Sequence, residues 1–193
     1  VARRTGVRVE AWTVASADLR QGRHTPMLVD ALADGVPLWP DSNPLPPLPF
    51  TPADACFCAG CLLEWVSAGA RASARELAAG RLQRAAQRAR DDITRLATAA
   101  LLLTGDTRHR QVGSLRRFEQ RFVRPRVISA RVVAALAWAA SAYPEQGAGA
   151  DPRRPPPAPE AVASAELGCD LAAIMRRETV PWIVSRMGEL KNW

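Results

Sequence analysis

Apolar residues recur every three or four positions through the middle of the chain, which is the spacing of one face of an α-helix. The clearest stripe covers residues 82–103. Shorter stripes at 115–122 and 128–139 predict two further helices, and residues 53–79 predict a first helix or pair of helices. Because the loops between these stripes are short, we expect an antiparallel helical bundle over residues 53–143, and hence a mainly α fold.

The stripes also predict which side chains fill the core. We expect nine large apolar residues to be buried together: Leu82, Ile93, Leu96, Leu103, Leu115, Phe118, Phe122, Val132 and Leu136.

The start of the chain shows a different pattern. Residues 7–14 alternate apolar and polar side chains, which is typical of a strand. Thr25 and Pro26 then provide a helix start, and the helix should end before Gly35. A short extended segment follows at residues 36–39, and we expect it to pair in parallel with the first strand. The N-terminal region is therefore predicted to be a small β-α-β unit.

Two proline-rich stretches, at residues 41–49 and 144–159, interrupt these elements. Proline lacks a backbone donor and blocks helices, so both stretches are expected to be extended linkers. Pro181 is expected to divide the C-terminal region into two helices. The predicted organisation is a β-α-β unit (1–43), a linker (44–52), the bundle (53–143), a second linker (144–159) and C-terminal helices (160–193).

The charge is concentrated in the centre of the chain. The formal net charge is +7, and residues 71–131 contain 15 arginines but only five acidic residues. Such a balance favours a polyanion such as nucleic acid as a partner. Four of the arginines follow one helix face, namely Arg81, Arg84, Arg88 and Arg95. This face either binds phosphate groups or is simply the solvated side of an amphipathic helix.

The sequence also bears on location. The first 20 residues lack the continuous apolar stretch of a signal peptide, and no run approaches the roughly 18 apolar residues of a membrane span. We therefore expect a cytoplasmic protein that does not contact a membrane, with its cysteines reduced.

The four cysteines allow two interpretations. Cys58 and Cys61 have the spacing of a metal chelate, and a zinc site could add Cys56 and Cys169. A second close pair is missing, however, so packing of the reduced thiols in the apolar core is the favoured interpretation.

Two stretches resemble one arrangement of known families. Residues 25–39, Thr-Pro-Met-Leu-Val-Asp-Ala-Leu-Ala-Asp-Gly-Val-Pro-Leu-Trp, resemble the end of a bacterial polymerase-β-type nucleotidyltransferase domain. In that family the preceding strand carries the third metal-binding carboxylate, and Glu10 occupies the matching position here. Residues 101–115, Leu-Leu-Leu-Thr-Gly-Asp-Thr-Arg-His-Arg-Gln-Val-Gly-Ser-Leu, together with Phe118 and Phe122, resemble the centre of a HEPN domain, a helical bundle often joined to such enzymes.

The resemblance implies nucleotidyl transfer from a nucleoside triphosphate with Mg²⁺ in the intact family. The chain contains no Asp-x-Asp or Asp-x-Glu pair to hold the metal, so the catalytic half is expected to be absent and no cofactor is expected for this chain alone. Glu10 would then act only beside metal carboxylates supplied upstream. The candidate phosphate-binding residues are Arg88, Arg95, Arg108, His109 and Arg110.

The alternative function is a non-catalytic HEPN-like interaction module, such as an antitoxin. It would form a homodimer or bind a cognate protein, and it could bind nucleic acid.

Overall fold

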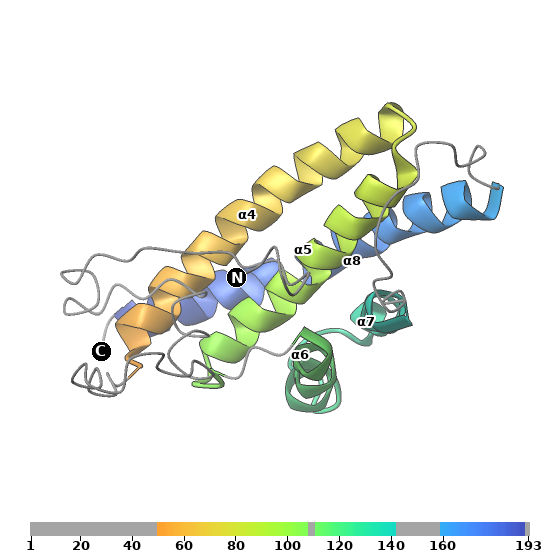
Figure 1. The fold of residues 1–193 in the computed structure, drawn as a ribbon. Helices are drawn as coiled ribbons and strands as arrows, with labels where there is room; N and C mark the ends of the chain where they lie inside the picture. Colours follow the sequence, from red (N-terminus) through yellow and green to blue (C-terminus); the bar gives the residue numbers. More distant parts are fainter. Residues whose placement is uncertain (1–49, 108–110, 142–158, 192–193) are drawn as a thin grey trace, which may run out of the picture.

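The computed structural model describes residues 50–107, 111–141 and 159–191, which are helical and contain no strand. Three long helices lie side by side: α4 (Pro52–Ala78), α5 (Leu82–Leu102) and α8 (Pro159–Lys191) (Figure 1). Two short helices, α6 (Gln111–Phe118) and α7 (Val133–Ser141), pack against α5, and α7 also packs against α8. The predicted helical bundle is confirmed, whereas the predicted β-α-β unit lies outside the described residues.

The hairpin of α4 and α5 is defined by clear signals at both ends of α4. At its start, the Thr51 hydroxyl accepts a hydrogen bond from the Asp54 backbone N–H, and the Asp54 carboxylate accepts one from the Thr51 N–H. At its end, Gly80 adopts a φ of +67°, and the N–H groups of Gly80 and Arg81 bond back to Leu77 and Glu76. The connection is so short that the two helices must run antiparallel.

Helix α5 ends at Leu102, close to the end of the predicted stripe at residue 103, and Gly105 just beyond it has a φ of +77°. Asp106 is buried just beyond this end. Its carboxylate lies 3.1 Å from Nε of Arg117 and 3.9 Å from a guanidinium nitrogen of Arg121. These ion pairs attach the end of α5 to the helix that follows.

The predicted helix at residues 115–122 is split into two parts. The α-helix α6 ends at Phe118 and continues as one π-helical turn, η1 (Glu119–Val123). The Phe118 and Phe122 rings lie 5.0 Å apart, and the Phe122 ring lies 4.8 Å from the Trp182 ring in an edge-to-face contact. This aromatic cluster joins η1 to α8. A 3₁₀ turn, η2 (Ala130–Val132), then leads into α7.

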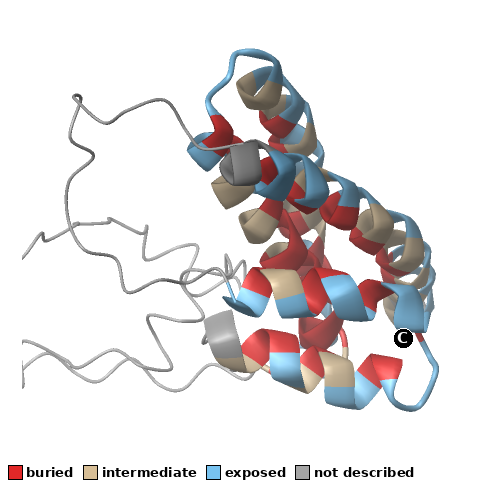
Figure 2. Cartoon of the chain, turned by 90° about the vertical axis from the view of Figure 1, so that its right-hand side faces the viewer, coloured by how far each residue is buried: buried red, intermediate tan, exposed pale blue. Residues whose placement is uncertain are grey.

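The core agrees with the apolar stripes of the sequence. All nine predicted core residues are buried, and eight of them belong to one continuous cluster, with Leu82 buried outside it. The same cluster includes Leu171, Met175 and Ile183 of α8. Buried residues line the inner faces of the helices in Figure 2. The C-terminal region therefore shares one core with the central helices.

The expectation of two C-terminal helices separated at Pro181 is wrong. Helix α8 continues through Pro181 as one element of 33 residues. Proline removes one backbone hydrogen bond in a helix interior, but Pro181 itself is exposed. Its neighbours Thr179 and Ile183 are fully buried in the bundle. Packing on both sides of the proline thus holds the helix together.

Helix α4 is more apolar than the sequence-based expectation allowed. Among the residues that the structure describes, it is the one helix long and apolar enough to cross a membrane, by length and composition alone. Within its most apolar stretch, 44% of the residues are buried inside the bundle. The core helix of a globular protein passes the same test.

Candidate functional site

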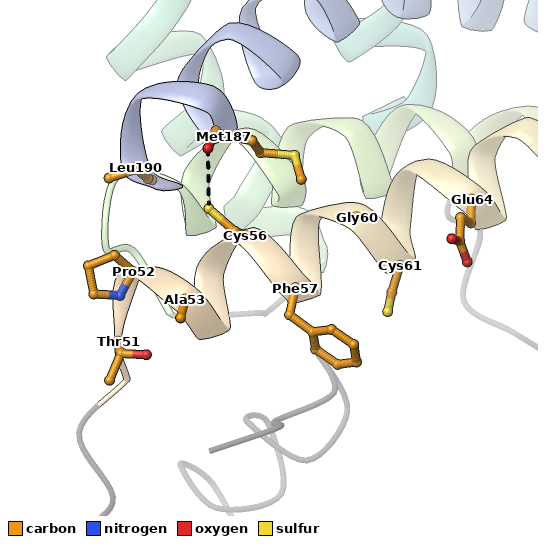
Figure 3. A pocket seen from close by; sticks show the side chains of 10 residues that line it. All are labelled: Thr51, Pro52, Ala53, Cys56, Phe57, Gly60, Cys61, Glu64, Met187 and Leu190. Carbon is orange, nitrogen blue, oxygen red and sulfur yellow. Dashed lines mark hydrogen bonds between the residues drawn. The ribbon is translucent and has the colours of Figure 1, made fainter. Parts of the chain in front are cut away.

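An apolar groove lies between the start of α4 and the end of α8 (Figure 3). Its volume is about 750 Å³. Most of its lining comes from α4, and α8 contributes Met187 and Leu190. The Phe57 side chain stands at the edge of the groove and is 43% exposed. Ala53 has only a methyl group and Gly60 has no side chain beside it, so the groove combines a protruding ring with hollows.

Thiol groups lie in and behind this groove. Cys56 is buried, with its Sγ 3.8 Å from the carbonyl oxygen of Met187. Burial raises the pKa of the Cys58 thiol to about 12, with a further contribution from Cys61. Burial also raises the pKa of Cys61, which lines the groove. These two thiols are therefore protonated at neutral pH, and thiols in this form are poor nucleophiles.

The zinc alternative required four cysteines in one place. The structure keeps Cys56, Cys58 and Cys61 near the start of α4, whereas Cys169 lies in α8, where the carboxylates of Asp170 and of Asp92 in α5 act on its thiol. The described parts of the chain contain no group of three or more His, Cys, Asp or Glu side chains arranged to hold a metal.

A second candidate surface is the end of the α4–α5 hairpin, which carries five exposed arginines. We call this group the arginine tip, and it consists of Arg71, Arg75, Arg81, Arg84 and Arg88. Arg71 and Arg75 come from the last two turns of α4, and the others come from residue 81 and the first turns of α5. Arg81, Arg84 and Arg88 belong to the predicted basic stripe. The structure adds the two arginines of α4, which lie on another helix and were not part of that prediction.

Among the residues that the structure describes, one acidic residue, Glu76, accompanies the arginine tip. Its carboxylate accepts a hydrogen bond from Arg81 and lies 3.9 Å from a guanidinium nitrogen of Arg88. The hydrogen bond from Arg81 lowers the pKa of Glu76, and the charges of Arg81, Arg84 and Arg88 lower it further. Glu76 thus neutralises one of five positive charges.

Arg95, the fourth member of the predicted stripe, is engaged elsewhere. Its guanidinium lies 3.4 Å from the Asp92 carboxylate and 5.8 Å from the centre of the Trp65 ring. Arg95 is thus engaged by a carboxylate and an aromatic ring of the protein itself. It does not extend the phosphate-binding surface of Arg88.

Asp92 is a buried carboxyl group that the sequence analysis missed. It is 1% exposed and lies against Gly69 of α4, where a β-carbon would collide with its oxygens. Burial raises its pKa to about 6, although Arg95 and Arg176 act in the opposite direction. The sequence did contain a signal, because Asp92 occupies a position of the apolar stripe, three residues after Ala89 and four before Leu96.

The structure does not describe the remaining predicted site residues. Arg108, His109, Arg110 and Glu10 lie outside the described residues. Of the predicted phosphate-binding residues, the structure therefore places only Arg88 and Arg95, and it assigns them to different surroundings.

Comparison of this chain with protein-family models, with curated proteins and with solved structures finds no match.

Proposed function

We propose that this chain is a protein-interaction module that associates with a second copy of itself through the groove between α4 and α8. The observation that carries this proposal is the exposed Phe57 ring beside hollows of the same groove. An interface between two identical copies requires a surface that is complementary to itself. A protruding ring and an adjacent hollow on one surface meet this requirement.

The spacing of the groove residues along α4 supports such pairing. Ala53, Phe57, Gly60 and Glu64 all line the groove, and their separations of four, three and four residues read the same in both directions. A twofold axis between Phe57 and Gly60 would place Phe57 of each copy over Gly60 of the other. A β-carbon at Gly60 would lie 3.7 Å from Met187 Cε, so the second copy's ring would enter beside this methionine.

Sedimentation analysis of the full chain over a wide range of concentrations tests the proposal. We expect a dimer that dissociates on dilution. Phe57→Asp should raise the dissociation constant by at least about 30-fold, because an aromatic residue at the centre of an interface contributes about 2 kcal/mol or more. Gly60→Leu should have a similar effect by filling the hollow.

Val184→Asp is the matched control. Val184 is 56% exposed on α8 and is not part of the groove, so the same charge should leave the dimer intact. A monomer at every concentration, or equal effects of the Phe57 and Val184 variants, would contradict the proposal.

A second candidate function follows from the resemblance to nucleotidyltransferases. In this proposal the helical bundle is the substrate- or partner-binding part of such a protein. The support is the order of segments in the sequence, with the HEPN-like stretch at residues 101–123 following the nucleotidyltransferase-like stretch at 25–39.

An assay of label transfer addresses this second candidate. Because the chain contains no Asp-x-Asp or Asp-x-Glu pair, we expect no transfer from a labelled nucleoside triphosphate with Mg²⁺. Transfer that depends on Mg²⁺ and is lost in Glu10→Gln would instead show that this chain is itself a nucleotidyltransferase.

A further inference from the structure

Among the residues that the structure describes, the arginine tip carries more positive charge than the neighbouring acidic side chains compensate. Five arginines occupy the last turns of α4 and the first turns of α5, and Glu76 forms ion pairs with two of them, Arg81 and Arg88. Concentrating like charges on one exposed end is unfavourable unless an anionic partner offsets their repulsion. The side chains are exposed, so their guanidinium groups are available to a ligand from solvent.

The side chains of the arginine tip favour nucleic acid over a membrane surface as the anionic partner. Guanidinium groups form paired hydrogen bonds with phosphate oxygens, which makes arginine well suited to nucleic-acid backbones. A protein that binds a membrane surface adds large apolar side chains that insert between the lipids. No large apolar residue is exposed over residues 71–88, where the exposed side chains besides arginine are alanine and glutamine.

We infer that the arginine tip binds the phosphate backbone of nucleic acid without reading its sequence. After Glu76 is set against one of the five arginines of this described region, four positive charges remain and would contact about four phosphates. The arginine tip lies at the opposite end of α4 from the apolar groove, so both surfaces are available at once (Figure 1).

Binding of a labelled DNA duplex of arbitrary sequence to the full chain tests this inference. With about four phosphates neutralised, the association constant should fall about 100-fold when monovalent salt rises from 50 to 200 mM. An unrelated sequence of the same length should bind equally well.

Two variants locate the binding. Substituting Arg75, Arg84 and Arg88 together with glutamine should weaken binding and reduce the slope of log K against log salt by about three. Glu76→Gln should tighten binding, because it removes the acid that competes for Arg81 and Arg88. A merely structural effect would not change affinity in opposite directions.

The matched control replaces three exposed arginines elsewhere, Arg116, Arg124 and Arg177, with glutamine, so that the net charge changes equally. This variant should bind as the parent does. The inference is overturned if the control weakens binding as much as the variant of the arginine tip, or if the parent does not bind the duplex. Binding to vesicles of anionic phospholipid without binding to the duplex would also overturn it.

Discussion

Asp92 brings a carboxyl group into the contact between α4, α5 and α8. Gly69 of α4 leaves room for it, Arg95 and Asp91 act on it from α5, and Arg176 acts on it from α8. The pKa of the Cys169 thiol in α8 is raised mainly by burial and by Asp170. The Asp92 carboxylate raises it further. The negative charge of Asp92 is therefore partly compensated by the two arginines. Burial nevertheless favours the protonated carboxyl group more strongly than water does.

This arrangement predicts how stability depends on pH. The pKa of Asp92 is raised from 3.8 to about 6 in the folded state, so folding favours the protonated form. The stability contributed by protonation is complete below about pH 4 and is lost as the pH rises through 6, by up to about 3 kcal/mol. Asp92→Asn should remove this loss.

Urea unfolding at a series of pH values from 4 to 8 measures the effect. As the pH rises from 4 to 8, the free energy of unfolding of the parent should fall relative to that of the Asn variant. Parallel curves for the two proteins would show that Asp92 does not titrate in this range.

At the scale of elements, the aromatic cluster of α6, η1 and α8 is a test of the packing. Phe118 is fully buried against Phe122. Phe118→Ala should lower the free energy of unfolding by about 3–5 kcal/mol, because it removes a ring and leaves a cavity. Arg116→Ala is the control and should change stability by less than about 0.5 kcal/mol, since Arg116 is exposed. Its neighbour Arg117 would be unsuitable, because it pairs with the buried Asp106.

Pro181 gives a second prediction at this scale. It lies inside α8 and is exposed, so alanine would restore a backbone hydrogen bond without changing the core. Pro181→Ala should raise the free energy of unfolding by about 1–3 kcal/mol, as measured by chemical denaturation. Val184→Ala on the same helix should cause little change. No gain from the proline replacement would mean that the backbone geometry at Pro181 is required for the packing of α8.

Local sequence patterns predicted some of these elements and missed others. The apolar stripe of α5 predicted this helix correctly, because the stripe depends on local spacing. The continuity of α8 was missed, because it depends on contacts of Thr179 and Ile183 with distant residues. The groove was missed for the same reason, since it joins residues 51–64 to Met187 and Leu190.

At the scale of the whole molecule, the helices present two different surfaces at opposite ends of α4. The apolar groove lies at the start of this helix and the arginine tip lies at its end. A dimer formed through the groove would place one arginine tip on each side of the twofold axis. Two separated basic surfaces on one particle would bind nucleic acid more tightly than one, provided that both reach the same molecule.

The association of two copies through the groove is tested most directly by cross-linking between chains. Protein labelled with ¹⁵N is mixed with unlabelled protein and treated with a flexible thiol cross-linker at alkaline pH, where a larger fraction of the Cys61 thiol is ionised. The products are analysed by mass spectrometry. Because Cys61 lines the groove, we predict cross-links that join Cys61 of a heavy chain to Cys61 of a light chain. Phe57→Asp should abolish these cross-links. Cross-links confined to single chains, or between chains only through Cys169, would contradict the proposed interface.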